Sequence, residues 1–434
     1  MMPQGVADFK YENDSSANNL TALAGMPLFI DLLEKMSFSS IIKKHLQYRT
    51  KANCWSDTEQ IRTLLFLNIA GGDCVDDINV LNSDKGLCSL IKHLQLRKEG
   101  LSRRKRREII KQGISSNKQV FPSQTSIREY LKIFHNESQE LLREQSSMKS
   151  FIPEPNNALR SLGRINSEFL KFLQLNSPSA IATIDIDATL IPTNKRTAKY
   201  SYKKFKAYQG LNAWWDEQQM VLNTEFRDGN VNAAHQITRF LKETLHHLPE
   251  GIKEIAIRSD TAGYQYDLMD FCEIVDKRNN GDKRFGKIKF AIGVDVSKSF
   301  REAVAGIPDS EWITLEPQKD INNGSVVECA EVCYVTNRNS KNLKAANYRY
   351  LVTRQLLSEQ MVFKLEDKFK EEQLKLPFPV AEINNRNYKI HGIVTNYDYK
   401  ELSVRQVINW FYQRAGYSEK VHSVTSFGLH SRPV

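Results

Sequence analysis

The sequence has no long apolar run, which argues against a membrane-spanning helix. The longest local candidate, residues 64–70, is far shorter than the roughly 18 residues needed to cross a bilayer, and it ends at Gly71 and Gly72. Residues 1–13 contain no basic start followed by an apolar stretch, so they do not resemble a secretory signal. We therefore expect a cytoplasmic protein with no membrane partner.

Cysteine is also scarce, and its spacing predicts neither a disulfide framework nor a zinc site. The six cysteines are scattered, and only Cys329 and Cys333 lie close together in the sequence. No histidine stands near them at a ligand spacing. Reduced cysteines, as in a cytoplasmic protein, are the better interpretation.

Positive charge exceeds negative charge in this chain. It has 61 Lys and Arg against 51 Asp and Glu, a formal net charge of +10. A basic balance makes a polyanion such as nucleic acid or acidic lipid a plausible partner, but it does not predict a fold. A length of 434 residues suggests two or three domains, and a hydrophobic fraction of 41% is sufficient for buried cores.

Residues 1–179 are expected to be mostly helical and to bind DNA. Apolar residues recur at helical spacing within residues 61–69 and 126–134, and Pro122 and Ser123 are helix start signals before the second stretch. Between these stretches lies the strongest cluster of positive charge: Arg103, Arg104, Lys105, Arg106 and Arg107. Such a cluster could contact DNA phosphates and release counterions. The alternative is a solvated loop or helix face.

After a linker at residues 177–179 the pattern becomes that of an α/β domain. Strands are predicted at residues 181–186, 220–226, 252–257 and 287–294, with a further strand expected, but not placed, between the first two. Helices are predicted at residues 233–248 and 263–275. This order predicts a mixed sheet with flanking helices over residues 180–294.

Residues 295–400 form a β-rich segment, and residues 401–434 return to a helix. Strand candidates lie at residues 332–336, 348–353 and 388–395, with a charged helical piece at 366–375. The last helix is predicted over residues 404–421.

Asp185 and Asp187 share one face of the first predicted strand, because side chains two apart in a strand point the same way. Two carboxylates on one face of an apolar strand are unusual, since a buried carboxylate is costly unless it is paired or metal-bound. The alternative is that both lie in water at the end of the strand. The pattern leaves open which of the two would be the first metal ligand.

Two more acids stand at informative positions. Asp260 follows a predicted strand and precedes a helix, where open α/β sheets bind ligands, although an aspartate there can also be a helix N-cap. Glu419 continues the apolar stripe of the last helix, so it should point toward the sheet or its rim. The alternative is an ion pair at the helix end with Lys420 or His422.

Asp187, Asp260 and Glu419 together would suit metal-dependent phosphoryl transfer. Mg²⁺ prefers oxygen ligands and retains waters. Two such ions about 3.5–4 Å apart can activate a water or a 3′-hydroxyl and stabilise the leaving oxygen. We therefore predict two Mg²⁺ ions, which Mn²⁺ could replace, on these three carboxylates.

Several motifs resemble the DDE transposases of bacterial insertion sequences, in the group with a long β-rich insertion between the second Asp and the Glu. The resemblance runs from about residue 20 to residue 424. The about 160 residues between Asp260 and Glu419 fit that group. The motifs are Gly-Gly-Asp at 71–73, Phe-Pro-Ser-Gln-Thr-Ser at 121–126, Asp-Ile-Asp-Ala-Thr at 185–189, Phe-Arg-Asp-Gly-Asn at 226–230, Arg-Ser-Asp-Thr-Ala-Gly-Tyr at 258–264 and Tyr-Gln-Arg-Ala-Gly-Tyr-Ser-Glu at 412–419.

The resemblance implies a ribonuclease-H-like core with the first Asp on the first strand, the second after the fourth strand and the Glu on a late helix. By the family's Asp-x-Thr pattern the first acid is Asp187, with Asp185 beside it. Phe411 or Tyr412 would match a tyrosine of the family's last helix, and Arg414 an arginine that would clamp a DNA phosphate. The implied partner is double-stranded DNA, both element ends and target, bound by a homodimer in the bacterial nucleoid.

The C-terminal part departs from the family pattern. The spacing from Arg414 to Glu419 is one residue longer than usual, Ser426 stands where the family has a lysine, and the tail does not resemble the family's further helical segment. We therefore expect a C-terminally truncated copy. The runner-up function is a catalytically dead remnant that only binds DNA. A ribonuclease-H-like nuclease without strand transfer is disfavoured, because it would not need the β-rich insertion.

Overall fold

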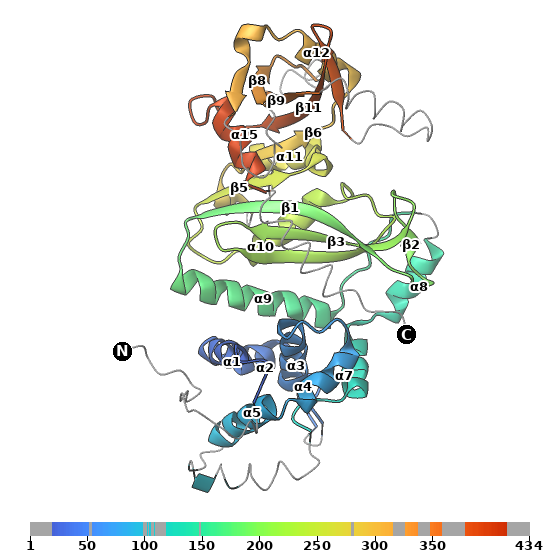
Figure 1. The fold of residues 1–434 in the computed structure, drawn as a ribbon, viewed down its shortest axis with the longest axis vertical. Helices are drawn as coiled ribbons and strands as arrows, with labels where there is room; N and C mark the ends of the chain where they lie inside the picture. The colour runs from blue at the N-terminus through green and yellow to red at the C-terminus, as the bar shows by residue number, and fades with distance from the viewer. Residues whose placement is uncertain are drawn as a thin grey trace.

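The computed structural model describes residues 20–51, 54–98, 119–146, 149–278, 282–315, 326–336, 348–357 and 378–414, together with residues 102, 104, 105 and 108. Figure 1 shows helices of the N-terminal region at one end of the molecule and a large sheet with flanking helices above them. The N-terminal helices are α1 (Met26–Lys35), α2 (Phe38–His45), α3 (Asp57–Ile69), α4 (Ile78–Ser83), α5 (Lys85–Lys98), α7 (Gln124–Leu131), α8 (Glu137–Gln145) and α9 (Asn157–Asn176).

The predicted helical pattern of this region is confirmed. Ser123 caps α7 by accepting a hydrogen bond from the backbone N–H of Ser126, as its start signal predicts. Ile127 and Tyr130 of that helix are buried. A separate apolar core holds these helices together, including Met26, Ile30, Phe66, Leu67, Ile78, Leu81 and Ile127.

One mixed sheet contains every strand of the described part of the chain. Its strands are β1 (Ile181–Pro192), β2 (Lys199–Tyr200), β3 (Lys206–Trp215), β4 (Met220–Asp228), β5 (Glu254–Ser259), β6 (Lys289–Val294), β7 (Ile313–Leu315), β8 (Val327–Val332), β9 (Arg349–Leu356), β10 (Val380–Ile383) and β11 (Arg386–Thr395). β3 is the strand that the sequence led us to expect but did not place.

The first half of the sheet has the ribonuclease-H-like arrangement. β3 pairs antiparallel with both β1 and β4, so these strands form a meander. On the other side of β1, β5 and then β6 run parallel to it. The predicted fold class is therefore confirmed, with β1 as the central strand between an antiparallel and a parallel half.

The strands after residue 295 extend the same sheet beyond β6. β11 pairs antiparallel with β6, and β9, β8 and β7 follow in order. The strands predicted at residues 348–353 and 388–395 correspond to β9 and β11. The strand predicted at residues 332–336 was wrong, because the observed strand β8 precedes this range and ends at Val332. The helix predicted at 366–375 lies outside the described residues.

Helices flank this sheet as α10 (Ile237–His247), α11 (Tyr266–Glu273), α12 (Lys298–Ala305) and α15 (Val404–Tyr412). α10 begins later than predicted, because Gln236 adopts a left-handed conformation with φ of 55° that ends the preceding turn. α10 packs against α9 and β4, and α9 runs along the same side of the sheet (Figure 1). Within the described residues, none of the helices has both the length and the apolar character needed to cross a membrane.

The last described helix, α15, buries the apolar stripe seen in the sequence. Val407, Ile408 and Phe411 pack in a core with residues of β6, β8, β9 and β11. Ser403 caps the helix and Gln406 reaches back to the Ser403 backbone, which fixes where it begins. Residues 415–434, the end of the predicted 404–421 helix among them, lie outside the described part of the chain.

Candidate active site

Asp187 and Asp260 lie side by side because their strands run parallel. β1 and β5 are paired in register as far as Ile186 opposite Ser259, and the two aspartates are the next residue of each chain segment. Neighbouring strands are about 4.8 Å apart, so the two carboxyl groups are held close together on adjacent interior strands, at the carboxyl end of β5. Both residues are half-buried. The first and second predicted acids are thus brought together.

The backbone after Asp260 is held in place by a tight turn. One oxygen of Asp260, Oδ1, accepts a hydrogen bond from the N–H of Ala262 at 3.0 Å and caps the short 3₁₀ helix Thr261–Gly263. Asp260 is therefore a helix N-cap, as the sequence allowed. This hydrogen bond uses only one of its two carboxylate oxygens. Gly293 of β6 allows the turn to approach, since a Cβ there would lie 3.2 Å from the backbone nitrogen of Thr261.

The neighbouring charge of Asp187 makes ionisation of Asp260 more costly. Burial raises the pKa of Asp260, and the nearby charge of Asp187 raises it further. The guanidinium of Arg414 and the N–H of Ala262 act in the opposite direction without cancelling the shift. Two half-buried carboxylates held together in this way are a donor set that suits a hard divalent cation, because a cation relieves their repulsion.

Asp185 has a different environment, although it shares a strand face with Asp187. Both of its oxygens bind the guanidinium of Arg258, with Nε to Oδ1 at 2.6 Å and Nη2 to Oδ2 at 2.8 Å. Both side chains are 0% exposed. Burial raises the pKa of Asp185, and the Arg258 charge opposes that shift. Such a bidentate pair leaves Asp187, rather than Asp185, facing Asp260.

Arg258 also joins two other parts of the molecule to this pair. Its Nη2 lies 3.0 Å from a carboxylate oxygen of Asp216, in the turn between β3 and β4. Its Nη1 donates a hydrogen bond of 2.9 Å to the carbonyl of Trp410, and its guanidinium lies 5.4 Å from the centre of the Trp410 ring. One buried arginine therefore ties α15 to the strands that carry the aspartates.

The end of α15 brings Arg414 toward the acids, whereas Tyr412 points elsewhere. The charge of Arg414 acts on both Asp185 and Asp260. The hydroxyl of Tyr412 lies 3.2 Å from Thr353 Oγ1 and 3.2 Å from His391 Nδ1, on β9 and β11. Phe411, the other tyrosine-matching candidate, is buried in the core.

Residues 178–416 match the family model described as "Transposase DDE domain", which is more than half of the chain. The chain belongs to this transposase family. No curated protein matches the sequence. A solved structure titled "Cryo-EM structure of piggyBac transposase synaptic complex with hairpin DNA (SNHP)" is similar over 91% of this chain and 64% of that one, with 12% identity and a TM-score of 0.38. This chain therefore spans less than two thirds of the piggyBac transposase chain, and the likeness is too weak to add to the description of the fold.

Two other predicted sites of this transposase lie partly or wholly outside the described residues. Glu419 is outside them. Of the basic cluster only Arg104 and Lys105 are described; both are exposed, and Arg104 pairs with Glu108 at 3.3 Å. In the part of the chain that the structure describes, no group of three His, Cys, Asp or Glu residues could hold a metal ion. The two described acids are thus a partial ligand set.

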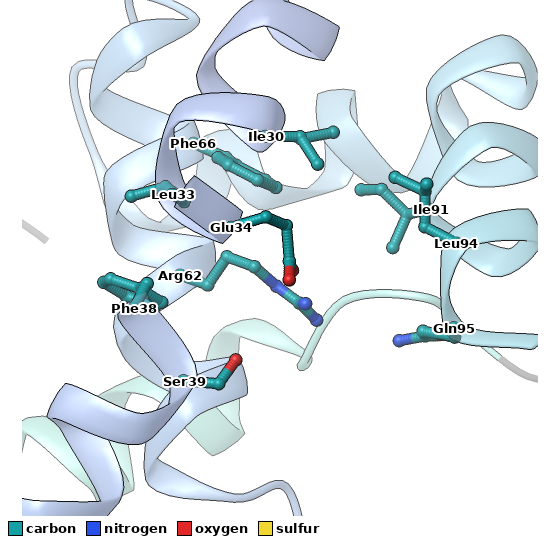
Figure 2. A pocket seen from close by; sticks show the side chains of 10 residues that line it. All are labelled: Ile30, Leu33, Glu34, Phe38, Ser39, Arg62, Phe66, Ile91, Leu94 and Gln95. Atoms are coloured by element: carbon teal, nitrogen blue, oxygen red, sulfur yellow. The ribbon is translucent and has the colours of Figure 1, made fainter. Parts of the chain in front are cut away.

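A pocket in the N-terminal helical region of the transposase is separate from the acids. Figure 2 shows Glu34 and Arg62 extending toward its centre between apolar side chains such as Phe66 and Ile91. Burial lowers the pKa of Arg62. The residues that line the pocket come from α1, α2, α3 and α5, and none belongs to the sheet.

Sequence reasoning missed Arg258 and its partner Asp216. A signal was present, because Arg258 stands two residues before Asp260 just as Asp185 stands two residues before Asp187. Opposite charges at matching positions of two adjacent parallel strands predict a pair on the shared face. That inference needed the register of β1 and β5, which the sequence pattern alone does not supply.

Proposed function

We propose that this transposase cuts and joins DNA at the terminal inverted repeats of an insertion sequence, using divalent metal ions bound by Asp187, Asp260 and Glu419. The observation that carries the proposal is that Asp187 and Asp260 lie side by side on the adjacent parallel strands β1 and β5. Burial and the charge of Asp187 raise the pKa of Asp260, which agrees with this arrangement. A structural N-cap alone would not need a second carboxylate at that place.

Each side chain has a part in this reaction. Asp187 and Asp260 would hold Mg²⁺ through their oxygens, and Glu419 would complete the set from the last helix. When bound, two Mg²⁺ ions activate a water or a 3′-hydroxyl and stabilise the leaving oxygen. Arg414 would contact a phosphate of the DNA end beside the acids. Arg258 would keep β1, β5 and α15 in register while the DNA binds.

The partner would be double-stranded DNA, both the element ends and the target. The excess of positive charge, +10, favours such a partner. Residues 1–179 would provide the first DNA contacts, with the cluster from Arg103 to Arg107 among them. A homodimer would bridge two DNA ends.

Cleavage of the element's own DNA tests the proposal. A supercoiled plasmid carrying the gene with its flanking genomic DNA is incubated with the protein and Mg²⁺, or Mn²⁺. We expect metal-dependent cutting that Asp187→Asn and Asp260→Asn reduce at least about a hundredfold. The matched control is Asp267→Asn, an exposed aspartate in the first turn of α11. It should cut like the wild type.

Two results would overturn the proposal. One is cutting by Asp187→Asn or Asp260→Asn at the wild-type rate. The other is tight binding of the plasmid by the wild-type protein without any cutting in either metal, which would identify a protein that only binds DNA.

A further inference from the structure

The connection from β1 to β3 is uniformly basic. We call residues 193–208 the basic hairpin; it contains β2 and the start of β3. It has no Asp or Glu in its 16 positions. Its cations are Lys195, Arg196, Lys199, Lys203, Lys204 and Lys206. Among the described residues, no carboxylate forms an ion pair with Lys195, Arg196, Lys203 or Lys204, all four of which are exposed.

Two tyrosines stand among these cations with their rings in solvent. Tyr200 is 64% exposed and Tyr202 is 76% exposed. The Nζ of Lys203 lies 5.8 Å from the ring centre of Tyr202, and that of Lys206 lies 5.9 Å from that of Tyr200. Large exposed rings interleaved with lysines are typical of surfaces that contact the sugar-phosphate backbone and bases of nucleic acid.

The base of the basic hairpin is firmly anchored. Arg143 of α8 donates hydrogen bonds to Asp228 at 2.7 Å and to the carbonyl of Thr197 at 2.7 Å. Gly229 packs so closely that a Cβ there would lie 2.4 Å from the carbonyl oxygen of Ala207. These contacts give the Phe-Arg-Asp-Gly-Asn motif a role that the acids do not explain: it fixes the hairpin in one position.

The basic hairpin lies within reach of DNA bound at the acids. Along the paired strands, Asp187 is opposite Asn212 and Pro192 is opposite Ala207, so five residues of strand separate the two places. At about 3.3 Å per residue the base of the hairpin is about 17 Å from Asp187, or half of the roughly 34 Å that one turn of duplex occupies, and the hairpin cations lie beyond that base. Figure 1 shows β2 at the far end of β1 and β3.

We propose that the basic hairpin is a second DNA-contacting surface, which binds the phosphate backbone of duplex DNA at least about half a turn from the cleaved bond. This rests on the proposed function for its position relative to the cut, but not for binding itself. Lys195, Arg196, Lys203 and Lys204 neutralise phosphates, and the hydroxyls of Tyr200 and Tyr202 contact the same backbone. The anchored base lets them bind without first ordering a loop.

Binding to a 40-base-pair duplex of random sequence, measured by fluorescence anisotropy over a range of salt concentrations, tests this proposal. The variant changes Lys195, Arg196, Lys203 and Lys204 to Gln. The slope of log affinity against log salt should become shallower by up to about 3.6, at about 0.9 for each lost phosphate contact. The matched control changes four exposed cations outside residues 1–179 and outside the hairpin to Gln: Lys253, Lys283, Lys298 and Arg386.

The control should keep the wild-type slope, and both variants should keep the wild-type melting temperature. An unchanged slope in the hairpin variant, or equal losses in the hairpin and control variants, would overturn the proposal. So would a loss seen only with a single-stranded 40-nucleotide probe, because the proposed partner is duplex DNA.

Failure of this proposal and failure of the proposed function give different results. Asp187→Asn protein should bind the duplex with the wild-type slope, since it retains the hairpin. If wild-type protein binds through the hairpin but never cuts, the proposed function fails while the hairpin proposal stands. If the hairpin variant binds and cuts like the wild type, only the hairpin proposal fails.

Discussion

Replacing Arg258 by methionine should destabilise the protein strongly at neutral pH. Methionine has a similar length but cannot pair with Asp185, whose carboxylate is fully buried. Removing one partner of a buried ion pair costs about 3–5 kcal/mol, and the lost hydrogen bond to the Trp410 carbonyl adds about 1 kcal/mol. We therefore expect the free energy of unfolding to fall by at least about 4 kcal/mol, measured by urea denaturation.

The loss in the free energy of unfolding caused by Arg258→Met should become smaller as the pH is lowered, which is unusual for an ion-pair mutant. Burial already raises the pKa of Asp185 in the wild type, and in the variant it acts without the opposing guanidinium, so the folded pKa rises further above the unfolded value of about 3.9. A carboxyl group with a raised folded pKa contributes stability that is present below the unfolded pKa and is lost as the pH rises through the folded pKa. Urea denaturation at pH 5 and pH 7 should therefore show the larger deficit at pH 7.

A double variant separates the buried charge from other effects. Asp185→Asn with Arg258→Met removes both charges and should recover part of the lost stability, because no unpaired carboxylate remains. The reasoning would be refuted if Arg258→Met lost less than about 1 kcal/mol, or if its deficit were the same at both pH values.

Three further predictions concern Asp260, the turn after it, and the Arg143 contacts at the base of the basic hairpin. Asp260→Asn should raise the melting temperature measured without metal, since it removes a carboxylate whose pKa is raised. It should also abolish the increase in melting temperature caused by Mg²⁺, and a retained increase would contradict the proposed metal site. Gly293→Ala should lower cleavage at least about tenfold, because its methyl group presses on the turn after Asp260; unchanged cleavage would contradict the close packing. Arg143→Ala should cost about 3–5 kcal/mol in urea denaturation, against at most about 1 kcal/mol for the exposed Arg160→Ala; equal losses would contradict it.

The sequence predicted the elements whose side chains alternate or repeat clearly. The buried stripe of Val407, Ile408 and Phe411 is an example, since burial on one face leaves a regular pattern. The strand beginning at Ile181 was predicted from its short run of strand-forming residues, and residues 182–186 are all buried. β3 was expected but not placed. It lies inside the sheet and buries Gln209 and Asn212 beside apolar residues, so its pattern does not alternate.

The candidate site could be predicted only in part. Asp260 was identified from its position after a predicted strand, and Asp187 from the two aspartates on one face of the first strand. The pattern could not separate Asp187 from Asp185, because both share that face. Their difference depends on Arg258, which pairs with Asp185 across strands that are 73 residues apart in the sequence. Such a contact follows from the parallel register of β1 and β5, and local periodicity does not contain that information.

The location of Mn²⁺ in crystals of the protein, found by anomalous diffraction, tests the central claim most directly. The account predicts a manganese ion with oxygen ligands from both Asp187 and Asp260 at about 2.0–2.2 Å, with Glu419 completing the set and Asp185 still bound to Arg258. Manganese bound elsewhere, or by Asp185 in place of Asp187, would contradict it.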